Sequence, residues 1–419
     1  MRIALLAHLR HPIAAPFMGG MEAHTWHLAR GLTARGHDVT LFASGDSDAV
    51  GDLWPVLPRG YHGDYRPGEP ALNALLDDRM ADVARRLTDG GFDVIHNNGL
   101  HRYPPRLARQ HRVACVTALH VPPFDALHRA VGDSPAPWSR FTVTSARQMH
   151  SWWGDVPPSC ATVVHNGIDP ALWPFSPTGD GSAVWAGRIT PNKGAHLAVQ
   201  AAALAGAPLT LFGAIEDRAY FDATIKPHLT GDIRYGGLLS GADLAREFGR
   251  SSVLLFTPLW DEPFGLTAVE AMCCGLPVAA LDMGAAREVI GAGGCFAETP
   301  DAPGLAAALS AALSVPRRAA RDRVLNHFTI DRMIAGYEAQ YQAAIAGLSQ
   351  TLPPVTFPAW DLCDVADTAP WRRSEPLICT FCNPASCRPT PCGLTMGAAD
   401  RSAEIHDPCP TPTRCRASC

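Results

Sequence analysis

The feature of this sequence that most constrains its fold is a regular alternation between short apolar strands and helices with one apolar face. Residues 2–7 predict a buried strand, and a Met-Gly-Gly turn at 18–20 separates it from a helix that Gly36 closes. The apolar run at 39–42 predicts the next strand. A strand, a glycine turn, a helix and a strand of this length are typical of the crossover unit of a parallel sheet.

The alternation continues along the chain with one interruption. Further strands are expected at 93–95, 113–119, 141–144 and 162–164, and residues 52–70, rich in Pro, Gly and Tyr, are expected to form a loop. A proline-broken stretch at 166–180 then stops the pattern. It restarts with expected strands at 183–186, 209–212, 233–235, 253–257 and 277–280, and expected helices at 192–205, at 242–249 and from 265. The sequence therefore predicts an α/β fold with two doubly wound, Rossmann-like domains, whose ligands bind at the carboxyl ends of the strands.

We expect the first domain to span residues 1–170 and the second 171–328. A last helix is predicted within 329–348, where Thr329 can cap an apolar stripe. The tail, 349–419, is expected to be disordered, because its last 70 residues hold 11 Pro and 8 Cys and show no helical or strand period. Its single C-x-x-C pair, Cys379 and Cys382, lacks a second close pair, so we expect reducible thiols rather than a zinc site.

Composition excludes several classes of protein. The net charge of −5 argues against a nucleic-acid binder, which normally carries a basic excess. No run approaches the roughly 18 apolar residues of a membrane-spanning helix, and the apolar start is too short for a secretory signal. The first 362 residues hold five Cys in no disulfide framework. We therefore expect a cytoplasmic protein without a transmembrane segment, and peripheral membrane contact stays open.

The most informative motif is residues 261–275, which contain two glutamates eight residues apart. Glu262 falls in a loop after a strand, and Glu270 falls inside the helix that begins near Gly265. The free N–H groups and the dipole of a helix N-terminus favour an anion such as a phosphate. Two carboxylates beside a phosphate site need hydroxyl partners, which a sugar and a ribose would supply.

Three other places follow strand ends. Arg188 and Lys193 lie five residues apart between a strand and a helix, and Lys193 is one of only two lysines beside 33 arginines. Both side chains suit phosphate oxygens. Gly19 and Gly20 let the backbone approach a phosphate closely in the equivalent loop of the first half. His120 follows the strand at 113–119.

These motifs in this order resemble the retaining glycosyltransferases of family 4, which have the GT-B fold of two facing Rossmann-like domains. The resemblance covers about residues 1–345 and is carried by the Glu-x7-Glu motif in its Pro-Phe-Gly context, Gly-Arg…Lys-Gly, Gly19-Gly20 and Asn166-Gly167-Ile168-Asp169. It implies that the final helix crosses back to the first domain. That first domain would then be the acceptor side, and the second would bind the donor.

The resemblance also implies the roles of the site residues. Arg188 and Lys193 would bind the diphosphate of a nucleotide-diphosphate sugar, Glu262 the donor sugar and Glu270 the ribose. Gly19 and Gly20 would lie near the phosphates, the backbone of Phe264, Gly265 and Leu266 against sugar and phosphate, and His120 near the reacting sugar. The implied reaction moves a hexosyl-type group to an acceptor hydroxyl with retention, without metal or cofactor. The implied partners are the nucleotide sugar and the acceptor: a glycan, a small molecule or a lipid.

Other interpretations stay open at this point. A nucleotide-sugar epimerase or a phosphorylase would keep the fold and change the reaction, and a non-catalytic member would only bind the nucleotide sugar. Asp46-Ser47-Asp48 is a weak candidate for a metal site, and Gly291–Gly294 is a poor match to a dinucleotide fingerprint because it opens no helix after a strand. Glu288 is either a surface acid or a neighbour of the ribose.

Overall fold

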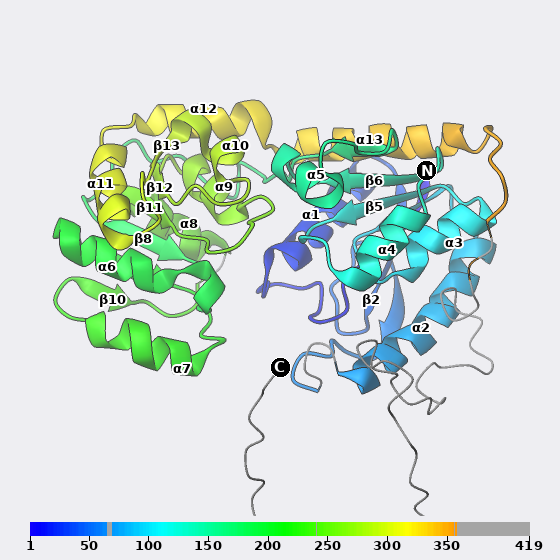
Figure 1. Ribbon diagram of the computed structural model, residues 1–419, viewed down its shortest axis with the longest axis horizontal. Helices are drawn as coiled ribbons and strands as arrows, with labels where there is room; N and C mark the ends of the chain where they lie inside the picture. The colour runs from blue at the N-terminus through cyan, green and yellow to red at the C-terminus, as the bar shows by residue number, and fades with distance from the viewer. Residues whose placement is uncertain (65–68, 240, 356, 358–419) are drawn as a thin grey trace, which may run out of the picture. The chain divides into compact units, whose positions relative to one another are not determined.

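The computed structural model describes residues 1–64, 69–239, 241–355 and 357. It contains two separate sheets in which every neighbouring pair of strands is parallel. Both sheets belong to one compact unit of the chain. This arrangement is the pair of Rossmann-like domains that the strand–helix alternation predicts (Figure 1).

The first sheet has seven strands in the order β3-β2-β1-β4-β5-β6-β7. They are β1 (Arg2–Leu6), β2 (Asp38–Ser44), β3 (Asp52–Leu57), β4 (Val94–Asn97), β5 (Cys115–Leu119), β6 (Ser139–Val143) and β7 (Ala161–Val163). Its helices are α1 (Gly20–Ala34), α2 (Pro70–Asp89), α3 (Tyr103–His111), α4 (Asp125–Asp133) and α5 (Ala146–Trp153). Strand β1 is buried on both faces: Ile3 and Leu5 pack towards α1, and Ala4 and Leu6 pack towards α2 and α3.

The second sheet has six strands in the order β10-β9-β8-β11-β12-β13. They are β8 (Ala183–Ala186), β9 (Leu209–Phe212), β10 (Ile233–Tyr235), β11 (Val253–Phe256), β12 (Val278–Ala280) and β13 (Gly294–Phe296). Its helices are α6 (Ala195–Ala205), α7 (Arg218–Tyr220), α8 (Gly241–Arg250), α9 (Leu266–Cys273), α10 (Ala286–Ile290), α11 (Ala302–Ala312) and α12 (Arg317–His327). Short helical turns occupy Pro191–Lys193, Phe221–Ile225, Lys226–His228 and Gly291–Gly293. Helices α6 and α11 cover one face, and α8, α9 and α12 the other.

The last helix, α13 (Ile330–Gly347), follows α12 but packs on the first sheet. Met333, Ile334, Tyr337 and Tyr341 are buried there, and α13 contacts α1, β4, β5 and β6. This helix, orange in Figure 1, is the predicted crossing helix. Thr329 caps its start by accepting a hydrogen bond from the backbone of Arg332.

The chain beyond α13 keeps contact with the first half for several residues. Arg109 donates to the carbonyl of Pro353 over 2.9 Å, and Phe357 is 9% exposed against the guanidinium of Arg106. The packed part of the chain therefore extends beyond residue 349, where the sequence predicts the tail to begin. The rest of that predicted tail, with Cys379 and Cys382, lies outside the described residues.

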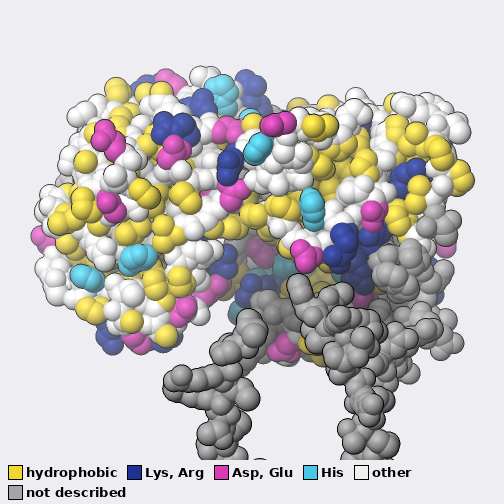
Figure 2. Space-filling model, viewed as in Figure 1, with side chains coloured by type: hydrophobic (Ala, Val, Ile, Leu, Met, Phe, Trp, Pro, Cys, Tyr) yellow, Lys and Arg dark blue, Asp and Glu magenta, His cyan; other side chains and the backbone are white. Residues whose placement is uncertain are grey.

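The predicted loop at 52–70 is wrong for its first part, because residues 52–57 form strand β3. Pro55 lies inside this strand, and a proline in a sequence favours a loop over a strand. A proline is tolerated there because β3 is the edge of the sheet, where one row of N–H groups has no strand to pair with. On the face in Figure 2, acidic and basic side chains are interspersed, as the small net charge suggests. No helix among the described residues is long and apolar enough to span a membrane.

Candidate active site

A cavity of about 680 Å³ is lined by both halves of the chain. The predicted site residues that line it are Gly19, Gly20, Arg188, Lys193, Leu266 and Glu270. They come from the start of α1, from the loop between β8 and α6, and from the first turns of α9. All three places follow the carboxyl end of a strand, which is where ligands of doubly wound sheets bind. Glu262, His120, Phe264 and Gly265 are not part of this lining.

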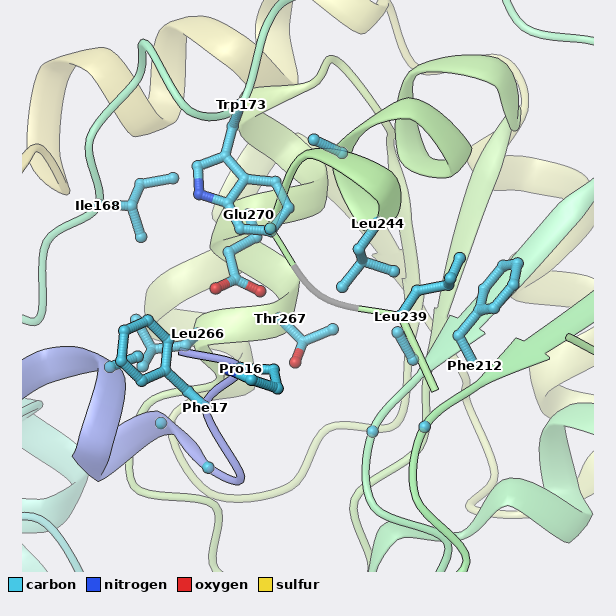
Figure 3. A pocket seen from close by; sticks show the side chains of 18 of the residues that line it. Pro16, Phe17, Ile168, Trp173, Phe212, Leu239, Leu244, Leu266, Thr267 and Glu270 are labelled. Carbon is cyan, nitrogen blue, oxygen red and sulfur yellow. The ribbon is translucent and has the colours of Figure 1, made fainter. Parts of the chain in front are cut away.

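Glu270 points into the cavity from α9, with Trp173, Ile168 and Leu266 around it (Figure 3). Its carboxylate accepts no hydrogen bond from the described residues. Burial raises the pKa of Glu270 from 4.5 to about 7, because the apolar surroundings disfavour the charged form. Because none of the described residues bonds to it, the carboxyl group of Glu270 can form hydrogen bonds with a ligand in the cavity.

Glu262 lies in the loop between β11 and α9, and its carboxylate already accepts hydrogen bonds from other side chains. Its Oε2 accepts a hydrogen bond of 2.6 Å from Lys193 Nζ and one of 2.7 Å from the indole N–H of Trp260. The backbone around it is fixed as well, since Ala285 donates to the carbonyl of Glu262 over 2.8 Å. A side chain at Gly284 would come within 2.3 Å of the same backbone, so this approach requires a glycine.

Arg188 is also paired with a carboxylate. Its Nη1 lies 2.9 Å from Glu216 Oε2, and the two side chains are 38% and 20% exposed. Two titratable groups of the first half, Glu22 and His11, interact electrostatically with Arg188 and Glu216. Burial raises the pKa of Glu22 and lowers that of His11 to about 4, and the charges of Arg188 and Glu216 act on both groups. The predicted diphosphate cations, Arg188 and Lys193, are thus both neutralised by acids.

The turn after Glu262 is held from the first half of the chain. The hydroxyls of Thr144 and Ser145 donate to the carbonyl of Pro263 over 2.9 and 2.8 Å. Glu288 accepts from the backbone N–H groups of Ala146 and Arg147 at the start of α5. These contacts join the two halves directly behind the Glu-x7-Glu motif.

Glu288 therefore ties two helices together and does not line the cavity. It also bonds His165 Nε2 over 2.9 Å. Burial alone would raise the pKa of Glu288, but these hydrogen bonds hold it below its ordinary value.

His120 is buried directly after β5, and burial lowers its pKa to about 4. Its Nε2 lies 3.0 Å from Asn98 Oδ1, which also accepts from His96 Nε2 over 2.8 Å. The ring of His24, which does line the cavity, is 4.4 Å from that of His120 between centroids. Neutral His120 therefore stands behind the cavity wall, within a network that reaches α13 through Tyr337 and Tyr341.

The three residues after Pro263 differ in their placement. The side chain of Phe264 is buried against Phe328, with ring centroids 5.4 Å apart. Gly265 has a φ of +93° at the start of α9. A side chain at Gly20 would lie 2.9 Å from Leu266, which shows how closely the starts of α1 and α9 approach each other.

The weaker candidates have structural explanations. Asp46 accepts from the backbone of Gly60, and Gly291–Gly293 forms a short helical turn before β13. No group of three or more metal-ligating side chains occurs in the part of the chain that the structure describes.

Sequence reasoning missed Trp260 and Asn98 as site neighbours. Asn166 Oδ1 is buried without a hydrogen-bond partner among the described residues, although its motif carries the family resemblance. The available signal was position: Asn98 lies three residues after the strand expected at 93–95, and Trp260 precedes the first glutamate by two residues.

Comparison with known proteins agrees with this geometry. The family model "Glycosyltransferase Family 4" matches residues 18–172, and "Glycosyl transferases group 1" matches residues 175–324. D-inositol 3-phosphate glycosyltransferase of Geodermatophilus obscurus is 30% identical over 439 residues, which cover 86% of this chain and 94% of the relative. Glycogen synthase of Mycobacterium tuberculosis is 25% identical over 408 residues, covering 84% and 97%.

Among solved structures, Anabaena HepE in complex with UDP and glucose matches with a TM-score of 0.63 at 18% identity, covering 82% of this chain and 99% of that one. Two doubly wound domains with a cavity lined from both are the GT-B fold. The chain belongs to the family 4 glycosyltransferases.

Proposed function

We propose that this glycosyltransferase moves a hexosyl group from a nucleotide-diphosphate sugar to an acceptor hydroxyl, with retention at the anomeric carbon. The observation that carries the proposal is that Gly20, Arg188, Lys193 and Glu270 line one cavity. These four residues include two cations and a carboxylate, which match the diphosphate and the ribose of a nucleotide sugar. Support also comes from the Anabaena neighbour, which binds UDP and glucose.

In this proposal the diphosphate displaces Glu216 from Arg188 and shares Lys193 with Glu262. The free N–H groups at the start of α9 add positive potential to the same place. The ribose hydroxyls donate to Glu270, and the transferred sugar lies against Glu262. These groups neutralise the charge of the leaving diphosphate, so we propose that transfer needs neither a metal ion nor a cofactor.

The reaction then balances without a protein base. The bond between the anomeric carbon and the phosphate oxygen breaks, and the acceptor oxygen bonds to the same face of that carbon. The proton of the acceptor hydroxyl passes to an oxygen of the leaving diphosphate. His120 is neutral at pH 7 and lies behind the cavity wall, so we assign it no proton transfer to or from the substrate.

We also propose a cytoplasmic location. The five cysteines of the described residues, Cys115, Cys160, Cys273, Cys274 and Cys295, are free thiols. Free thiols are typical of a reducing compartment.

The test begins with a thermal-shift screen of UDP, ADP and GDP sugars, followed by assay of nucleoside diphosphate release and of product mass with candidate acceptors. The anomeric configuration of the product, read by NMR, decides retention. Turnover is then measured after exhaustive chelation with EDTA. We expect it to be unchanged, and a loss that Mg²⁺ or Mn²⁺ restores would contradict the metal-free proposal.

A further inference from the structure

We propose that Trp260 is a positioning residue for Glu262, and that it fixes which carboxylate oxygen of Glu262 remains for the donor sugar. This inference rests on the proposed function. Trp260 lies in the loop between β11 and α9, outside the Glu-x7-Glu motif and outside the cavity lining. It was not among the residues that the sequence assigns to the site.

The contacts are short and converge on one atom. The indole N–H of Trp260 and the ammonium of Lys193 donate to the same oxygen, Glu262 Oε2, over 2.7 and 2.6 Å. The other oxygen, Oε1, accepts no hydrogen bond from the described residues. Glu262 is 8% exposed, so this charge has little water to satisfy it and depends on its protein partners.

The indole also contacts the second partner. Lys193 Nζ lies 4.9 Å from the centre of the Trp260 ring, within the range of a cation–π interaction. One side chain therefore contacts both the predicted phosphate cation and the predicted sugar carboxylate. The carbonyl of Trp260 also accepts from the backbone N–H of Glu262 over 2.8 Å, so the loop holds the two residues in a fixed relation.

This arrangement matters when the diphosphate binds. Lys193 has three N–H donors, and a diphosphate would compete with Glu262 for them. A diphosphate attracts the indole of Trp260 much less than the ammonium of Lys193, because the indole N–H carries no charge. The loop that holds Trp260 is also fixed. With Lys193 turned towards phosphate, Trp260 keeps Oε2 engaged and leaves Oε1 to accept from a hydroxyl of the sugar.

The test compares Trp260→Phe, Glu262→Gln and the double variant. Trp260→Phe keeps a ring beside Lys193 and removes the N–H. We expect it to lower the rate of sugar transfer about tenfold or more, as for a lost hydrogen bond to a charged group. Affinity for nucleoside diphosphate, measured by calorimetry with UDP, ADP and GDP, should change less than about threefold. In the Glu262→Gln background, Trp260→Phe should have little further effect on the rate.

Trp138→Phe is the matched control. Its indole N–H donates to the carbonyl of Ala108 over 2.9 Å, in the first half and away from the cavity lining. We expect this control to leave transfer unchanged, and melting temperatures report any loss of folding in each variant. Effects of Trp260→Phe and Glu262→Gln that multiply in the double variant would overturn the proposal, since Trp260 would then act independently of Glu262.

An NMR measurement that needs no turnover tests the contact between Trp260 and Glu262 independently of the proposed glycosyltransferase activity. The indole N–H resonance of Trp260, assigned from the spectrum of Trp260→Phe, should move upfield in Glu262→Gln, because a charged acceptor becomes a neutral one. An unchanged resonance refutes the contact and the proposal with it. If the resonance moves but no nucleotide sugar is turned over by the unmodified protein, the proposed function fails, and Trp260 has no sugar-transfer role to support.

Discussion

Arg188 donates to Glu216 across 2.9 Å at the edge of the cavity, so a predicted ligand of the diphosphate is occupied by an acid of the same domain. An anion that binds Nη1 of Arg188 has to compete with this carboxylate. Lys193 shows the same relationship to Glu262. Both predicted phosphate cations are therefore paired with acids, and binding of a diphosphate would replace one anionic partner by another.

Replacing Glu216 by glutamine should tighten nucleoside diphosphate binding. Partly exposed ion pairs contribute about 0.2–1 kcal/mol, so we expect a gain of about 1.5- to 5-fold in affinity by calorimetry. The control is Glu298→Gln, the same charge change at an exposed residue outside the cavity lining. Weaker binding in Glu216→Gln would show that Glu216 orients Arg188 instead of competing with its ligand.

Substitutions of the two glutamates of the motif should affect different quantities: nucleoside diphosphate affinity for Glu270 and transfer rate for Glu262. If Glu270 holds the ribose, Glu270→Gln weakens free nucleoside diphosphate by about 10- to 150-fold, the effect of a lost charged hydrogen bond. Glu262→Gln should leave that affinity nearly unchanged and lower the transfer rate, because its carboxylate favours the positive charge that develops on the sugar. Calorimetry and initial rates on both variants test this, and equal losses of nucleoside diphosphate affinity would contradict the assigned roles.

Glu270 should also make stability depend on pH. Its pKa of about 7 in the folded protein exceeds the ordinary value of 4.5, so between these pH values the folded state binds more protons than the unfolded one. The free energy of unfolding should therefore fall as pH rises from 5 to 8, by up to about 3 kcal/mol relative to Glu270→Gln. Denaturant unfolding of both proteins across this range measures the difference. A difference that stays constant with pH would mean that Glu270 ionises normally.

The chain should tolerate truncation after residue 357 better than after residue 350. A cut at 350 removes the buried ring of Phe357 and the Pro353 carbonyl that Arg109 contacts. Burial of such a ring contributes roughly 1.5–3 kcal/mol, so the 1–350 protein should melt at a lower temperature than the 1–357 protein. Equal melting temperatures would show that residues 351–357 contribute no stability.

The sequence by itself determined the two-sheet architecture, because the information is local. Apolar runs such as 183–186 and 209–212 have the length of buried strands and are bounded by Gly or Pro, and they became β8 and β9 with the predicted bounds. The crossing helix could be predicted as a helix from its stripe of apolar residues. The position of each motif after a strand also placed Arg188, Lys193 and Glu270 at the carboxyl edge of the second sheet and Gly20 at that of the first, because the carboxyl ends of parallel strands in one sheet share an edge.

Only the tertiary structure decided which side chains meet. Trp260 and Lys193 are 67 residues apart in sequence, and nothing local relates the indole to that ammonium. Likewise, Glu288 meets the start of α5 and His120 shares Asn98 with His96 because chain segments far apart pack together. Strand β3 was missed for a related reason: Pro55 is acceptable only at an edge, and a residue's place in a sheet is a property of the whole fold.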